Sequence, residues 1–266
     1  MQGRLSEPEN NKIQQFPVNG WEKEIKILPH LGINLLEWTI DLSGFWENPF
    51  VFQEKSDLAR KILLENQVRV ESITCDYFMH RAEENYFRFT DDDRDFLSAI
   101  IKGSTKLGCK YIVIPLVDQA SVKSESKESD VLGFFFKFEK LLRDSQLKIA
   151  FESDFPPQKL SAFIDKFPKD TFGINYDMGN SASLGYDPQE EVSNYGNRIL
   201  NIHVKDRVLG GGTVVFGEGN VDFPEVFDQL RKIGYRGNYI LQGARSPIGD
   251  HSGIIRQYLK IIQAYL

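Results

Sequence analysis

Four polar residues that could bind a metal ion lie at the ends of successive apolar segments in the second half of the sequence. Glu152 ends "LKIAFE", Asp177 ends "FGINYD", His203 lies near the end of "ILNIHV", and Gln242 lies near the end of "NYILQG". Carboxylate, imidazole and amide ligands in this mixture suit a divalent ion such as Mn²⁺, Zn²⁺, Co²⁺, Fe²⁺ or Mg²⁺. A lone histidine in such a segment is more often a buried core residue. The set of four favours one divalent-metal site.

Polar residues also end the expected strands of the first half. Arg4 ends the first apolar segment, Glu37 lies in the second, and Asp76 follows the third. If these strands are parallel neighbours, their carboxyl ends meet at one face, where an α/β barrel carries its chemistry. We therefore expect Arg4, Glu37 and Asp76 to contact the substrate.

The elements that must position these residues alternate along the whole chain. Short apolar, β-branched runs predict eight strands, over residues 2–5, 33–39, 68–74, 111–116, 147–152, 172–177, 199–204 and 238–243. Segments with helical periodicity lie between them, over residues 21–31, 56–67, 91–107, 130–144, 223–233 and 253–266. This alternation predicts a single α/β domain over residues 1–266, a (β/α)₈ TIM barrel with outer helices. An open doubly wound sheet is the alternative, but no glycine-rich dinucleotide turn follows the first strand.

Glycine and capping residues support these boundaries. Gly32, Gly108 and Gly234 each follow a helical pattern and precede a strand, where a left-handed C-cap is expected. Asp222 precedes "FPE", which is typical of a helix N-cap followed by proline in the first turn. The polar stretch 121–130 is expected to be a solvated loop.

Composition excludes several classes of protein. The formal net charge of −6 over 266 residues argues against nucleic-acid binding, which depends on clustered Lys and Arg. Two cysteines, Cys75 and Cys109, form no disulfide framework and favour a reducing compartment. No signal-peptide pattern is visible at the first residues, and no apolar run is long enough to span a bilayer. We therefore expect a cytoplasmic protein that binds neither membrane nor nucleic acid.

The segment 205–220 after the seventh expected strand is long and rich in glycine. Barrels often bind an anion in the loops after strands seven and eight. Lys205 and Asp206 are therefore candidates for contacts to the substrate, and Arg207 and Arg245 for contacts to an anion. The loop could close over a substrate, or it could be a solvated surface connection.

Several short motifs resemble those of the sugar phosphate isomerase/epimerase family, the xylose isomerase-like TIM barrels also known as AP endonuclease family 2. They are "GINLLEW", "AFESD", "NYDMGN", "IHVKDR" and "FGEGNVDF". The resemblance covers essentially the whole chain, and the order and spacing of the motifs carry it. The family includes ketose 3-epimerases, hydroxypyruvate isomerase, inosose and dehydroshikimate dehydratases and, more distantly, endonuclease IV.

The resemblance implies a metal site made by Glu, Asp, His and Glu from the last four strands. Glu152, Asp177 and His203 match this pattern, whereas Gln242 stands where the family commonly has the second Glu. Asn180 stands where a histidine often follows the Asp-x-Gly turn, which removes a ligand of the multi-zinc endonucleases. The resemblance therefore favours a sugar or sugar-phosphate substrate over DNA, and it makes a homodimer a reasonable expectation.

The metal would act as a Lewis acid that stabilises an enediolate, and the resemblance assigns the proton transfer to Glu152. Epimerisation at C3 needs a second base, and the amide of Gln242 cannot serve as one at neutral pH. One-base aldose–ketose isomerisation therefore ranks above epimerisation, for which His80, Glu37 and Asp206 remain candidate second bases. A dehydratase on the same scaffold and a metal-free sugar-binding barrel are the alternatives.

Overall fold

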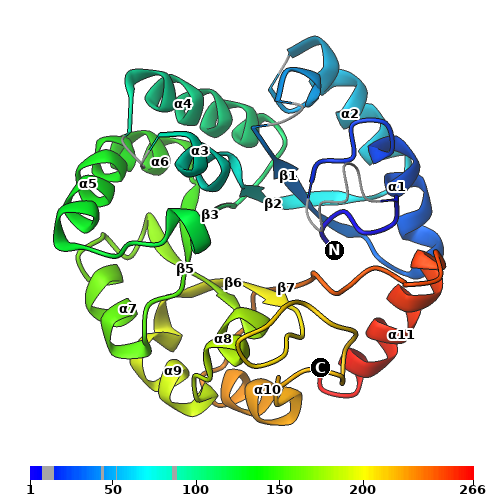
Figure 1. Cartoon of the computed structure of the whole chain (residues 1–266). Coiled ribbons are helices and arrows are strands. Elements are labelled where there is room, and N and C mark those ends of the chain that lie inside the picture. The colour runs from blue at the N-terminus through cyan, green and yellow to red at the C-terminus, as the bar shows by residue number, and fades with distance from the viewer. Residues whose placement is uncertain (8–14, 43–44, 52, 86–88) are drawn as a thin grey trace.

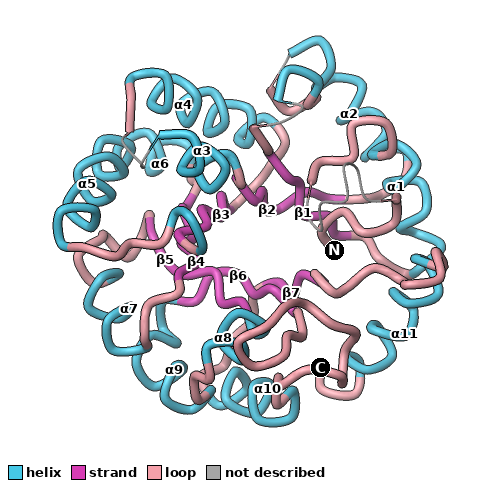
Figure 2. Tube along the Cα trace, in the orientation of Figure 1, coloured by secondary structure: helices cyan, strands magenta, loops and turns pink. Residues whose placement is uncertain are grey.

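A sheet of seven parallel strands forms the centre of the computed structural model, which describes residues 1–7, 15–42, 45–51, 53–85 and 89–266. The strands follow one another in sequence order around the barrel (Figure 2). They are β1 (Leu35–Ile40), β2 (Arg69–Cys75), β3 (Tyr111–Leu116), β4 (Lys148–Ser153), β5 (Phe172–Asp177), β6 (Ile199–Val204) and β7 (Asn238–Leu241). The predicted TIM barrel is confirmed, with one difference at the N-terminal strand.

Helices surround the strands (Figure 1). They are α1 (Trp21–Ile27), α2 (Gln53–Glu65), α3 (Tyr77–Asn85), α4 (Asp91–Lys106), α5 (Glu125–Phe135), α6 (Glu139–Ser145), α7 (Pro157–Ile164), α8 (Met178–Leu184), α9 (Pro188–Tyr195), α10 (Phe223–Lys232) and α11 (His251–Gln263). Among the described residues, none of these helices is both long and apolar enough to cross a bilayer.

The predicted strand over residues 2–5 is reduced to a single bridge. Gln2 bridges Glu37 of β1 and donates its backbone N–H to the carbonyl of Leu241 in β7, at 3.1 Å. The backbone N–H groups of Leu5 and Ser6 instead donate to the side chain of Glu24 at 3.1 and 2.7 Å. Met1 also bonds the backbone of Leu35 and Glu37 in β1, so the segment joins the two edge strands through its first two residues and leaves the sheet where Glu24 takes the next donors.

The predicted caps are present and explain where several helices begin and end. Gly32, Gly108 and Gly234 have φ angles of 72°, 76° and 68°, in the left-handed region that costs glycine little. Asp222 accepts a hydrogen bond from the backbone N–H of Glu225 at 3.0 Å and so caps α10. The prediction that residues 121–130 form only a loop is wrong, because α5 begins at Glu125.

Close packing between β5 and β6 leads to a stability prediction. A Cβ at Gly173 would lie 2.5 Å from the carbonyl oxygen of Arg198 and 2.5 Å from Cγ of Leu200. Gly173→Ala is therefore expected to destabilise the fold by about 1–3 kcal/mol, measured by urea unfolding. The matched control is Gly133→Ala in α5, where a new Cβ meets nothing within 4 Å. This control should be neutral or stabilising by up to about 1 kcal/mol, and equal effects of the two changes would contradict the argument.

Candidate metal centre

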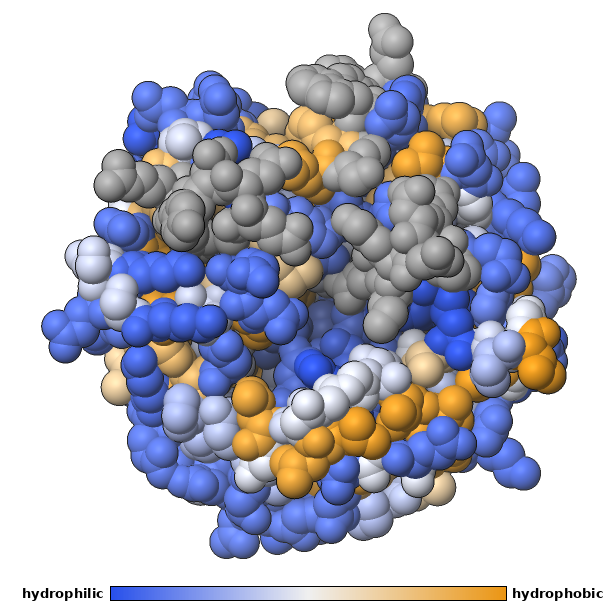
Figure 3. Space-filling view, in the orientation of Figure 1, coloured by the Kyte–Doolittle hydropathy of each residue, from blue (hydrophilic) through white to orange (hydrophobic). Residues whose placement is uncertain are grey.

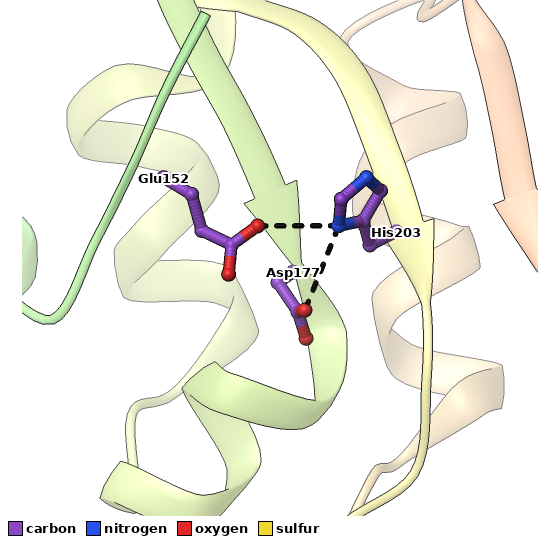
Figure 4. Close-up of side chains that lie close together, drawn as sticks. All are labelled: Glu152, Asp177 and His203. Atoms are coloured by element: carbon purple, nitrogen blue, oxygen red, sulfur yellow. Dashed lines mark ion pairs between the residues drawn. The ribbon is translucent and has the colours of Figure 1, made fainter. Parts of the chain in front are cut away.

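Three side chains from successive strands converge at the carboxyl ends of the sheet. Glu152 comes from β4, Asp177 from the end of β5 and His203 from β6, and they point toward one another (Figure 4). One ligand atom from each lies within 4.8 Å of the others, and all three residues are buried. In the space-filling view the centre of this face is hollowed and lined by hydrophilic residues (Figure 3). The separation of these residues in sequence predicted this convergence.

His203 presents its two ring nitrogens to different carboxylates. Nδ1 lies 3.1 Å from Oε2 of Glu152 and 3.7 Å from Oδ2 of Asp177. Among the described residues, Nδ1 nevertheless makes no hydrogen bond of acceptable geometry. Nε2 lies 2.6 Å from Oε1 of Glu37 on the other side of the ring. A buried nitrogen between two carboxylate oxygens is the arrangement that a divalent cation would complete.

Asp177 divides its two oxygens between a helix and the site. Oδ1 accepts a hydrogen bond from the backbone N–H of Asn180 at 2.8 Å and caps α8. Oδ2 lies 2.8 Å from Nζ of Lys205. Gly179 allows this approach, because a Cβ there would lie 2.7 Å from Cγ of Lys205. The turn that begins α8 thus fixes Asp177 and leaves room for the side chain of Lys205 beside it.

Two amides hold Glu152 in place. Asn175 donates to its Oε2 at 2.8 Å, and Asn180 donates to its Oε1 at 2.7 Å. Asn180 in turn accepts a hydrogen bond at 2.7 Å from Arg207, whose guanidinium also donates to the carbonyl of Gly211. These contacts link the loop after β6 to the candidate ligand on β4.

Neighbouring charges and hydrogen bonds together shift the pKa values of the buried cluster more than burial does. Burial alone would raise the pKa of Glu37, but the charge of His203 and several hydrogen bonds lower it to about 2. Burial opposes the charged form of His203, yet Glu37 and the other carboxylates hold its pKa well above the usual value. Burial also opposes ionisation of Asp177, but Lys205 and then His203 lower its pKa. Glu37 and Asp177 are therefore ionised, and ionisation is what a metal requires of a carboxylate ligand such as Asp177.

Gln242 follows the last residue of β7. Its backbone N–H donates to the carbonyl of Val204 at 2.9 Å, one residue beyond His203. The side chain is buried, and its Nε2 donates to Oε1 of Gln2. The side-chain carbonyl oxygen is the atom of Gln242 that could bind a metal. That Gln242 is a metal ligand stays a prediction.

The residues expected to contact substrate in the first half of the chain are buried. Arg4, Glu37 and Asp76 each expose 1% of their surface. Burial and then the charge of Arg245 lower the pKa of Arg4 to about 10, while Asp76 and other acids act in the opposite direction. Arg4 therefore lies within electrostatic range of Asp76 and of Arg245.

The loop after β6 is internally bonded. Asp206 is fully buried, and its carboxylate accepts hydrogen bonds from the backbone N–H groups of Gly217, Gly219 and Val221 at 2.8, 3.1 and 3.2 Å. Arg245 donates to the carbonyls of residues 3 and 6 at 3.3 and 3.0 Å. The contacts at Asp206 argue against a fully solvated connection over residues 205–220, and closure of this loop over a substrate stays a prediction.

Further polar residues, not anticipated as site residues from the sequence, support the cluster from inside the barrel. They are Ser72, Thr74, Asn175 and Asn201, and Asn180 supports it from α8. Four of the five lie on strands at even spacing from a site residue or from each other, as 72 and 74, 175 and 177, 201 and 203. That period of two places each pair on one face of its strand.

The donor set therefore fits a divalent cation. Two carboxylates and an imidazole nitrogen are ligands common to Zn²⁺, Mn²⁺, Co²⁺ and Fe²⁺ sites, and each is oriented by a further hydrogen bond or ion pair.

Comparisons with known proteins agree with this architecture. Rhizopine catabolism protein MocC of Rhizobium meliloti is 32% identical over 97 residues, which is 30% of each chain. Inosose dehydratase of Geobacillus kaustophilus is 29% identical over 109 residues, 34% of each chain. L-ribulose-5-phosphate 3-epimerase UlaE of Escherichia coli O1:K1 is 24% identical over 237 residues, 84% of this chain and 81% of that protein. The chain thus spans only about a third of the first two relatives.

Solved structures share the fold over nearly the whole chain. The IolI protein with a bound zinc atom superposes with a TM-score of 0.73 at 15% identity, covering 93% of this chain and 94% of that one. D-allulose 3-epimerase from Methylomonas sp., in complex with D-allulose, superposes with a TM-score of 0.73 at 16% identity, covering 95% and 93%. The family model described as xylose isomerase-like TIM barrel matches residues 13–264. The chain therefore belongs to the xylose isomerase-like TIM barrel family.

Proposed function

We propose that this protein is a divalent-metal-dependent isomerase or epimerase of a small sugar, sugar phosphate or related polyol. The single observation that carries the proposal is the buried cluster of Glu152, Asp177 and His203 at the carboxyl ends of β4, β5 and β6. That is the face on which α/β barrels carry out chemistry. Similarity to sugar epimerases supports the substrate class.

In this proposal Glu152, Asp177 and His203 hold the metal, and Gln242 adds its carbonyl oxygen. The bound metal would supply Lewis acidity that stabilises negative charge developing on oxygen atoms of the substrate. Lys205 keeps Asp177 ionised and oriented from 2.8 Å. Arg4 and Asp76 are proposed to complete the polar wall of the site, where both are buried.

Glu152 is proposed to move the proton. One of its oxygens removes a proton from the hydroxyl-bearing carbon beside the substrate carbonyl and returns it to the carbonyl carbon on the same face, while the proton of that hydroxyl passes to the former carbonyl oxygen. Its hydrogen bonds to Asn175 and Asn180 fix the carboxylate, so the proton transfer needs no large side-chain motion.

A second base on the opposite face is harder to assign. The amide of Gln242 does not accept a proton at neutral pH. The carboxylate of Asp206 accepts hydrogen bonds from three backbone N–H groups, which makes it a poor base. His80 lies 3.6 Å from Asp41 through Nδ1, so a nearby carboxylate could support it as a base. Because Gln242 and Asp206 are poorly suited to this role, one-base aldose–ketose isomerisation ranks above epimerisation, which would depend on His80.

A dehydratase on the same scaffold is the second candidate, favoured by the similarity to inosose dehydratase. One base suffices to remove a proton and start the loss of a β-hydroxyl group. Arg207 and Arg245 are the proposed contacts to a phosphate group of the substrate. Both guanidinium groups already donate to backbone carbonyls. An anion would have to replace those contacts.

The experiment is product analysis with protein of known metal content, in deuterated water, over matched sugars with and without phosphate and over keto-polyols. Isomerisation or epimerisation is expected to give a product of the substrate's composition, with deuterium gained at the reacting carbon. Loss of one water would establish the dehydratase instead. Binding of sugars without turnover, by protein that holds no metal, would overturn the proposal in favour of a sugar-binding barrel.

A further inference from the structure

Glu37 lies inside the barrel, against the side of His203 that faces away from Glu152. Its Oε1 is 2.6 Å from Nε2 of His203, and both side chains have no exposed surface. The contact joins β1 to β6 across 166 positions of sequence. A register shift in the pairing of β1 with β2 falls between Leu36 and Glu37, and such irregularities commonly redirect a side chain.

The carboxylate of Glu37 is surrounded by hydrogen-bond donors. Thr74 donates to Oε1 at 2.6 Å, and Ser72 and Asn201 donate to Oε2 at 2.6 and 2.9 Å. With the ring of His203, four donors meet two oxygens. A carboxylate held in this way cannot turn toward the mouth of the barrel, and it offers the imidazole only an acceptor.

The hydrogen between the two groups must therefore be on Nε2 of His203. Because a neutral imidazole carries one hydrogen and Glu37 holds that hydrogen on Nε2, Nδ1 is the nitrogen that gives up its proton and presents a lone pair when a cation binds. Nδ1 is the nitrogen that faces Glu152 and Asp177, at 3.1 and 3.7 Å. A carboxylate on the outer nitrogen of a ligating histidine fixes the ring and makes it a better ligand.

We propose that Glu37 is a positioning residue that makes Nδ1 the metal-binding atom of His203, instead of a substrate contact or second base. Ser72, Thr74 and Asn201 hold Glu37 for that task. The inference rests on the proposed metal site for its consequence, but the hydrogen bond itself does not depend on a metal.

The test compares Glu37→Gln with the matched control Glu71→Gln. Glu37→Gln keeps the size of the side chain but can turn an N–H₂ toward the ring. Glu71→Gln makes the same change at a buried carboxylate of the neighbouring strand β2, which bonds Lys110 and Asn238 instead of His203. In metal-free protein titrated with Zn²⁺ by calorimetry, Glu37→Gln is expected to weaken binding by about 10- to 100-fold. Glu71→Gln should change it by less than about threefold.

A second measurement reads the hydrogen directly and needs no metal. In ¹H–¹⁵N spectra of the metal-free protein, Nε2 of His203 is expected to carry a slowly exchanging proton, which Glu37→Gln should expose to faster exchange. If wild-type protein binds no Zn²⁺ but shows this proton, the proposed function fails and the role of Glu37 toward the ring stands. An Nε2 without a proton, or folded Glu37→Gln that binds Zn²⁺ as wild type does, overturns the inference.

Discussion

Replacing Glu152 with glutamine is expected to reduce turnover by about 10³-fold or more, since the change removes the proposed base and replaces a charged metal ligand with a neutral one. The substitution keeps the shape of the side chain and its acceptor for Asn180, but an amide cannot take a proton from carbon. The measurement is kcat at metal concentrations that saturate the variant, together with deuterium exchange into the substrate. Both should be lost.

Two further variants separate the roles of ligand and base. Asp177→Asn removes a proposed ligand that is not a base, so added metal should restore part of its turnover, whereas Glu152→Gln should stay inactive. Glu71→Gln removes a buried carboxylate that bonds Lys110 and Asn238 at the opposite end of the barrel. It should lower stability and leave kcat unchanged. Recovery of Glu152→Gln by excess metal would limit Glu152 to the role of ligand.

The strands were predictable because parallel strands are buried on both faces and read as continuous apolar runs. The expected strand 147–152 is observed as Lys148–Ser153, and 199–204 agrees in full. The start of α5 and the whole of α8 carried too little apolar periodicity to be predicted. The first turns of α5, capped by Ser124, are polar and resemble a loop until Val131. Helix α8 has seven residues, "MGNSASL", with no repeating apolar face.

The convergence of Glu152, Asp177 and His203 was predictable because equivalent ends of successive parallel strands meet at one face. The contact of Glu37 with His203 was not. It depends on the closure of the barrel between β1 and β7, which places β1 and β6 around the same interior, and on the register shift before Glu37. Polar residues two apart within apolar strands, such as Asn201 beside His203, were the signal available in the sequence.

The second large effect is expected from Gln242→Glu, which restores the residue that the family commonly has at this position. The proposed ligand set contains two carboxylates, from Glu152 and Asp177, and the change adds a third negative charge to it. Metal affinity should rise by about tenfold or more, or about 1.4 kcal/mol. The barrel can accept the new carboxylate, because Gln2 Nε2 lacks a hydrogen-bond partner among the described residues. A half-turn of the Gln2 amide would let it donate there.

The same change should alter the reaction as well as the affinity. A carboxylate on β7 would supply the second base that the amide cannot, so epimerised product is expected to appear beside the isomerised one. Gln242→Met is the matched control, since it has similar length but lacks both the charge and the carbonyl oxygen, and it should weaken metal binding and add no new product. Calorimetry with Zn²⁺ and analysis of the sugar products measure the two effects. Unchanged affinity in both variants would place Gln242 outside the metal site, leaving Glu152, Asp177 and His203 as its only proposed protein ligands.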